Sequence, residues 1–214
     1  MKKVFFLVVS SFLLFVGCEN PDIKALQKAQ QCLDQARTPQ DAQACRQYVQ
    51  GLTSQKAKSL SCAIETMAAG IDSSTMQSAF VDMTNTGPNG NKEAALLSHL
   101  SVGDKTTADT VFNVCNESDV PGLEYIAGLV RVATIVDTLG SGANFSADLS
   151  NCATNTSSCN PADIGETAVV LADSYCTGDN ANTNVCNEIN NAVANGGGDY
   201  SAIGSQLLSL LNTP

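Results

Sequence analysis

The chain has 214 residues, of which 11 are Lys or Arg and 21 are Asp or Glu, so its formal net charge at pH 7 is -10. Proteins that bind nucleic acid place clustered Lys and Arg against the phosphates, and this composition therefore excludes nucleic acid as an expected partner. The length suits one domain or two small ones and is sufficient for a buried core.

The chain begins with a segment that has the form of a targeting signal. Lys2 and Lys3 give it a short basic start, and residues 4–16 are apolar apart from Ser10 and Ser11. A membrane-spanning helix needs roughly 20 apolar residues. This run extends for only about 13, which is typical of a secretory signal peptide.

The segment ends in Phe15-Val16-Gly17-Cys18. This ending resembles the lipobox of bacterial lipoproteins, where a small residue precedes a cysteine that is acylated through its sulfur and becomes the new N-terminus. Phe15 departs from the family, which favours Leu three places before the cysteine. The resemblance implies a signal peptide over residues 1–17 and two or three acyl chains, such as palmitate, on Cys18. The alternative is a soluble secreted protein in which Cys18 is incidental.

The residue after Cys18 bears on the compartment. Enterobacterial lipoproteins with Asp at this place stay in the inner membrane, whereas this chain has Glu19. The resemblance therefore implies a lipid anchor in the outer membrane, on its periplasmic face or at the cell surface. Residues 18–22 would form the acylated cysteine and a short tether, followed by a single domain over residues 23–214.

The cysteine count agrees with export. The chain has nine cysteines, an odd number, but eight remain if Cys18 carries lipid. An even number suits an oxidising compartment, because disulfides persist there and free thiols react. No two cysteines have the two-residue separation of a zinc knuckle or a redox dithiol. The spacing favours disulfides between neighbours, namely Cys32 with Cys45, Cys62 with Cys115, Cys152 with Cys159 and Cys176 with Cys186.

The first two helices are predicted to form a hairpin. Apolar residues recur every three or four positions over residues 23–36, the spacing of a helix with one buried face, and Pro21 suits its first turn. A second helix is expected over residues 39–52, because a proline opens it and the apolar spacing continues. The turn between them brings Cys32 and Cys45 level.

More helices are expected before residue 116. Apolar residues between 60 and 71 predict a third helix, which Gly70 helps to end, and a fourth follows over residues 76–83. Ser73 or Ser74 is expected to cap the fourth helix. Two short helices then follow, around residues 92–100 and 107–115.

Residues 121–139 form the most apolar segment after the signal. The apolar side chains cover more than one face of a helix, which predicts a central position in the core. A second membrane span is the alternative, weakened by the charges of Glu124, Arg131 and Asp137.

The last third is also expected to be helical. Asn160 is expected to cap a helix that carries apolar residues up to Tyr175, and two further helices lie around residues 185–192 and 203–210. The sequence predicts an all-α fold, a disulfide-stapled multi-helix array or bundle. Two alternatives remain open, a subdivision of the domain near residues 140–160 and a tetratricopeptide-like solenoid, although the marks of the 34-residue repeat do not recur.

Charge is distributed unevenly along the chain. No Lys or Arg follows Arg131, whereas residues 132–214 contain eight acids. One interpretation is cation capture or a basic partner. The other is a solvated acidic surface that keeps an exported protein soluble and turns away from anionic lipid headgroups. The acids are Asp137, Asp148, Asp163, Glu166, Asp173, Asp179, Glu188 and Asp199.

The sequence does not indicate catalytic groups. The only histidine, His99, stands among leucines and is expected to be a partly buried or capping residue near a helix end. No nucleophile elbow or phosphate-binding motif is present, and the oxygen-rich loop 177–184 does not fit an EF-hand. We therefore expect no catalytic residue, no metal and no cofactor.

Three hypotheses about function follow. The leading one is a non-enzymatic, membrane-anchored envelope lipoprotein whose domain binds or organises an envelope protein partner. The second is a hydrolase of envelope polymers that uses paired carboxylates. The third is a carrier of lipid or of a small ligand, in which the helix over residues 121–139 lines a cavity.

Overall fold

A computed structural model describes residues 20–87, 91–139, 144–155, 159–178 and 181–212. The predicted signal peptide and Cys18 lie outside the described residues, as do residues 213–214 and parts of four loops, one of which contains Asp179. Over the described residues all regular structure is helical, which confirms the all-α prediction. The first helices are α2 (Pro21–Gln35), α3 (Pro39–Cys45), α4 (Gln55–Ala68), α5 (Ser73–Asn85), α6 (Lys92–Leu97) and α7 (Lys105–Asn116). The others are α8 (Pro121–Leu139), α9 (Phe145–Thr154), α10 (Pro161–Asp173), α11 (Thr183–Gly196) and α12 (Tyr200–Leu211), with short 3-10 helices η2 (Arg46–Tyr48) and η3 (Tyr175–Thr177).

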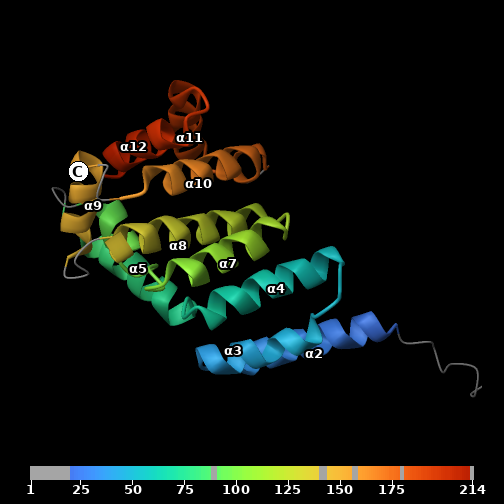
Figure 1. The fold of residues 1–214 in the computed structure, drawn as a ribbon. Helices are drawn as coiled ribbons and strands as arrows, with labels where there is room; N and C mark the ends of the chain where they lie inside the picture. The colour runs from blue at the N-terminus through green and yellow to red at the C-terminus, as the bar shows by residue number, and fades with distance from the viewer. Residues whose placement is uncertain (1–19, 88–90, 140–143, 156–158, 179–180, 213–214) are drawn as a thin grey trace, which may run out of the picture.

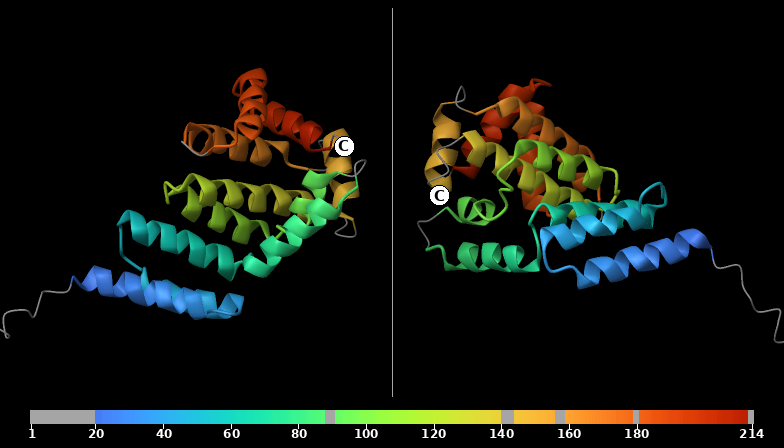
Figure 2. Two further views of the ribbon diagram at one scale, coloured as in Figure 1. Left: turned by 180° about the vertical axis from the view of Figure 1, so that it is seen from behind. Right: turned by 60° about the horizontal axis from the view of Figure 1, so that its bottom comes forward.

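The helices form a stack that follows the chain (Figure 1). The pair α2 and α3 lies at one end, followed by α4, by α7 and α8, by α10, and by α11 and α12 at the other end. Helices α5, α6 and α9 lie along one side of this stack (Figure 2). Helix lengths range from 6 to 19 residues. Because lengths vary and three helices leave the stack, the array is not a regular solenoid of repeated helix pairs.

Helix α8 occupies the middle of the stack, as predicted. Every residue from Val130 to Val136 is buried, and α8 packs against α7 on one side and α10 on the other. Within the described part of the chain, none of the helices combines the length and the hydrophobicity that a membrane span requires.

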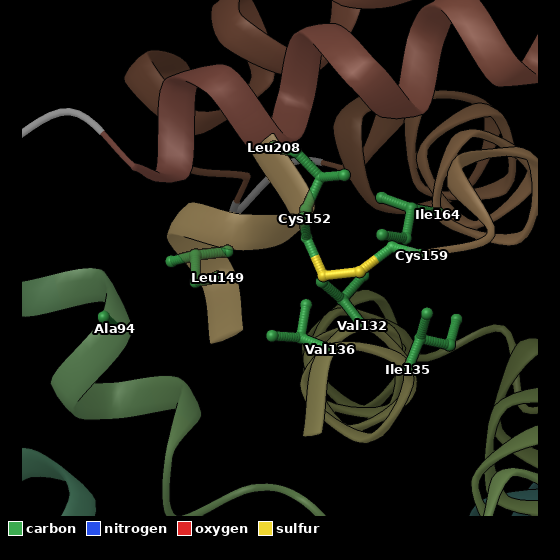
Figure 3. Close-up of a cluster of buried hydrophobic side chains, with 9 residues drawn as sticks. All are labelled: Ala94, Val132, Ile135, Val136, Leu149, Cys152, Cys159, Ile164 and Leu208. Atoms are coloured by element: carbon green, nitrogen blue, oxygen red, sulfur yellow. A yellow bond between two sulfur atoms is a disulfide. The ribbon is translucent and has the colours of Figure 1, made fainter. Parts of the chain in front are cut away.

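The four disulfides connect neighbouring elements of the stack, in the pairs that the spacing favours. Cys32–Cys45 joins α2 to α3, and Cys62–Cys115 joins α4 to α7. Cys176–Cys186 joins η3 to α11, and Cys152–Cys159 joins α9 to the residue pair that precedes α10. The Cys152–Cys159 disulfide lies in a buried cluster between four helices (Figure 3). The other side chains of the cluster that are drawn near it are Val132, Ile135 and Val136 of α8, Leu149 of α9, Ile164 of α10 and Leu208 of α12.

Several helix ends differ from the prediction. The second helix ends at Cys45 and not at Leu52, because the chain tightens into η2 and Gly51, with φ of 80°, then turns it toward α4. Helix α6 likewise ends at Leu97 and not at residue 100. Helix α9 was not predicted. By contrast, α2 begins at Pro21, the proline predicted for its first turn.

Two predicted caps are also different. Asp72, and not Ser73 or Ser74, caps α5, and its Oδ1 accepts the backbone N–H of Thr75 at 2.8 Å. A carboxylate also brings negative charge to the positive end of the helix dipole. Asn160 stands at the predicted cap position of α10, but its side-chain amide donates to the Asp163 carboxylate at 2.9 Å.

Helices α10 and α12 cross at two glycines, which the sequence analysis did not single out. A Cβ on Gly165 would collide with the backbone carbonyl of Tyr200, and a Cβ on Gly204 would collide with that of Pro161. Both glycines are buried. The two backbones approach so closely that only glycine fits at either position.

Candidate functional site

Arg131, the last cation of the sequence, lies at the centre of a network of ion pairs between α7, α8 and α10. Its side chain is 8% exposed, and its Nε lies 2.7 Å from Asp109 Oδ1 while Nη2 lies 2.8 Å from Glu166 Oε2. Nη1 donates to Thr167 Oγ1 at 2.8 Å, and the guanidinium stands 4.9 Å from the centre of the Phe112 ring. The cation is therefore matched by charge, by a hydroxyl and by an aromatic face.

Lys105 extends the network at the surface. Its Nζ lies 2.7 Å from Asp109 Oδ2 and 3.4 Å from Asp163 Oδ2. Burial by itself would raise the pKa of Asp109, but hydrogen bonds from Lys105 and Arg131 and the charges of both outweigh it and hold that pKa below its ordinary value. These contacts use the charged groups to hold α7, α8 and α10 together.

The acids of residues 132–214 do not form a uniformly solvated surface, which was one interpretation of the sequence. Asp163 and Glu166 belong to the cation-free last third, yet they pair with cations on α7 and α8. Asp148 is buried at 3% exposure, and Asp137 accepts a hydrogen bond from Ser101 at 2.7 Å. Among the described acids of this region, four are exposed, namely Glu166, Asp173, Glu188 and Asp199; Glu166 pairs with Arg131, and Asp199 caps α12.

His99 lies in the turn that follows α6 and is half-buried. Its Nε2 stands 2.7 Å from Asp82 Oδ2 of α5, so the contact joins α5 to α6. This agrees with a structural residue near a helix end. Over the described residues, no three His, Cys, Asp or Glu side chains gather closely enough to hold a metal ion.

Glu124 is a carboxyl group buried near the start of α8. The residue is 3% exposed, and among the described residues Oε2 has no hydrogen-bond partner. Burial raises the pKa of Glu124, the charge of Asp119 adds to this, and Ser174 opposes it. Glu124 does not line any of the three grooves that α2 helps to form.

Three grooves of the described structure involve the N-terminal helices, and one of them, of about 520 Å³, lies between α2 and the segment from α3 to Tyr48. A second, which we call the anchor-proximal groove, has a volume of about 570 Å³ between the first halves of α2 and α4. Its walls include Ile23, Leu26, Gln30, Lys56, Ser59 and Leu60. A third groove of about 470 Å³ lies where α2, α4, α5 and α8 meet. Only the start of α8 reaches it, whereas the middle of that helix, from Val130 to Val136, is buried.

The two parts of the fold differ in charge. Residues 20–71, which include α2, α3 and α4, contain six cations and four acids. Residues 72–214 contain three cations and sixteen acids. The part of the stack that contains α2, α3 and α4 is therefore slightly basic, and the remainder is strongly acidic.

Comparison with known proteins gives no relative for this chain. No protein-family model, no curated protein and no solved structure matches it. Function therefore has to be argued from the residues themselves.

Proposed function

We propose that this chain is a bacterial envelope lipoprotein, anchored in the outer membrane through acyl chains on Cys18. Its helical domain binds or organises another envelope component and catalyses no reaction. The proposal has two parts, the anchor and the binding function, and each has its own support and its own test.

The cysteine pairing is the observation that carries the anchor. All eight cysteines among the described residues pair with one another, so none of them remains as a partner for Cys18. Cys18 is also the residue at which the lipobox resemblance requires a free thiol. An exported protein with a single unpaired cysteine at the end of its signal peptide fits acylation better than an incidental thiol.

The short tether supports a fixed placement on the membrane. Asn20 already caps α2, and its side chain accepts the backbone N–H of Asp22 at 2.9 Å. Cys18 and Asn20 are two residues apart, a reach of about 7 Å at 3.3–3.6 Å per residue. The domain is thereby held near the lipid surface, as suits a module that presents a binding surface at a set height.

The charge division supports a partner that carries positive charge. The acidic part of the stack begins after α4 and extends to α11 and α12 at the end opposite to α2, and charge complementarity favours encounter with a basic surface. Asp173 and Glu188 are exposed there on α10 and α11, where a partner can reach them.

The anchor is tested by the intact mass of protein purified from membranes. We expect the added mass of two or three acyl chains on the wild-type protein and none on Cys18→Ser. A wild-type product that lacks acyl mass would contradict the anchor.

The binding function is tested by crosslinking in native membranes, with paired variants. Asp173→Asn with Glu188→Gln should weaken capture of the partner. The matched control, Asp22→Asn with Asp34→Asn, removes two exposed acids at the other end and should leave capture unchanged. If no partner is recovered reproducibly with the wild-type chain, a binding function is contradicted.

A further inference from the structure

An apolar surface is exposed on the helix that follows the anchor. The spacing of residues 23–36 predicts one buried face, but within α2 only Ala29 is fully buried. Ile23 in the first turn is 55% exposed and, with half-buried Leu26 and Leu60, lines the anchor-proximal groove. Large apolar side chains grouped at the surface indicate an interaction site.

Exposed lysines lie on both helices that form this groove. Lys56 of α4 is part of its wall, while Lys24 and Lys28 lie on the same helix as Ile23, where Lys28 lines the neighbouring groove between α2 and α3. Asp22 is the acid nearest to them in sequence. An amphipathic surface with apolar and basic side chains is the kind that binds at a lipid interface. A basic surface also has the charge that anionic phospholipid headgroups attract.

The position of the groove relative to the anchor decides which partner it meets. Ile23 follows Cys18 by five residues, and three of these already belong to the first turn of α2. The N-termini of α2 and α4 lie at the same end of the molecule, with α11 and α12 at the opposite end of the stack (Figure 1). Acyl chains on Cys18 would thus bring this groove to the membrane before any other part of the domain.

We infer that the anchor-proximal groove docks on the membrane, with an anionic phospholipid surface as its partner. Ile23, Leu26 and Leu60 contact the boundary of the acyl region, and the lysines contact lipid phosphates. The inference rests on the proposed anchor, which supplies a high local concentration of lipid. Docking then orients the stack, because the acidic residues 72–214 are repelled from the same anionic surface.

The chain allows a direct test, because it contains no Trp. A single Trp in place of Ile23 reports contact with lipid through a blue shift of its emission and through quenching by brominated phospholipids. Tyr200→Trp is the matched control, since Tyr200 is 46% exposed on α12 at the far end of the stack. The acylated mature protein is placed on phosphatidylcholine vesicles that contain phosphatidylglycerol.

We expect brominated lipid to quench Ile23→Trp strongly and Tyr200→Trp hardly at all. If Ile23→Trp fails to fold, as judged by circular dichroism, Gln27→Trp probes the wall of the same groove. Replacing Lys28 and Lys56 by Gln in unacylated protein should weaken its partition onto these vesicles about fivefold per lysine. Equal quenching at both positions, or none at Ile23, would overturn the inference.

Failure of the inference and failure of the anchor give different results. Acylated protein that floats with vesicles but shows no quenching at Ile23 overturns only the docking. Protein without acyl mass overturns the anchor, and the docking inference fails with it.

Discussion

Arg131 shows how much one side chain connects in this fold. Its guanidinium contacts α7 through Asp109 and α10 through Glu166 and Thr167, while its own helix is the centre of the core. From the sequence, Arg131 could be recognised as the last cation, but not its partners. They lie 22 to 36 positions away, and only the packing of α7 and α10 on α8 selects them.

Arg131→Ala should lower the free energy of unfolding by roughly 2–4 kcal/mol, because it leaves Asp109 and Thr167 without their cation in a partly buried place. Arg131→Lys keeps the charge but cannot reach all partners at once, so we expect an intermediate loss. Urea unfolding at pH 7 with the disulfides intact measures both. Equal stability of Arg131→Ala and the wild type would contradict a structural role for the network.

Glu124 should destabilise the fold at neutral pH. Burial raises its pKa above the ordinary 4.5, so the folded state disfavours the charged form. Glu124→Gln should then be more stable than the wild type at pH 7, by about 1 kcal/mol, the order of the cost of an unsatisfied buried group. The difference should shrink as pH falls through the folded pKa and vanish below 4.5. The midpoints of urea unfolding between pH 4 and pH 7 measure this difference. If it stays constant over that range, burial of the Glu124 charge is not its cause.

Asp109 should affect the stability of the fold in the direction opposite to Glu124. Its folded pKa lies below the ordinary 3.8, so the stability that it contributes is complete above 3.8 and is lost as pH falls through the folded pKa. Asp109→Asn should therefore be less stable than the wild type at neutral pH and approach it in strong acid. Urea unfolding from pH 7 down into acid well below pH 3.8 measures this, and a stabilised Asp109→Asn at pH 7 would be the contrary result.

At the scale of elements, local sequence signals predicted most helices and fewer of their ends. Spacing of apolar residues and prolines at first turns located α2, α4, α8 and α12. Helix α9 was missed, because Asn, Ser and Thr dominate its neighbourhood and its buried Leu149 and Cys152 give too short a pattern. The end of α3 was missed because η2 continues the same spacing with a tighter turn.

The crossing of α10 and α12 offers a sharp test of packing. Gly165→Ala or Gly204→Ala places a methyl group against the opposite backbone, and overpacking of this kind costs about 1–3 kcal/mol or more. Gly122→Ala is the control, because its Cβ would meet no atom within 4 Å and Ala favours helix. We expect Gly165→Ala and Gly204→Ala to lower the stability of the fold and Gly122→Ala to leave it unchanged. Thermal unfolding compares them, and unchanged stability at Gly165 would contradict the close approach.

At the scale of the whole molecule, the charge division sets how the protein responds to its solvent. Sixteen acids against three cations in residues 72–214 repel one another in the folded state. The ion pairs of Arg131 relieve this only locally.

Added salt should therefore stabilise the protein. Screening at about 0.1 M ionic strength acts beyond roughly 10 Å, which weakens repulsion between surface acids more than it weakens the buried contacts of Arg131. We expect the melting temperature to rise by roughly 2–4 °C, the shift that about 1 kcal/mol produces in a protein of this size. Calorimetry in sodium chloride and in choline chloride tests this, and a fall in both salts would mean that attractive ion pairs dominate.

The sequence by itself determined the helical class, the central position of α8 and the neighbour pairing of the cysteines, because each depends on spacing along the chain. The lipobox resemblance is likewise local. The tertiary structure decided the contacts between distant positions: the partners of Arg131, the crossing at Gly165 and Gly204, and the exposure of Ile23. Apolar spacing shows that a helix has one face to bury, but whether another element covers that face depends on how the helices pack.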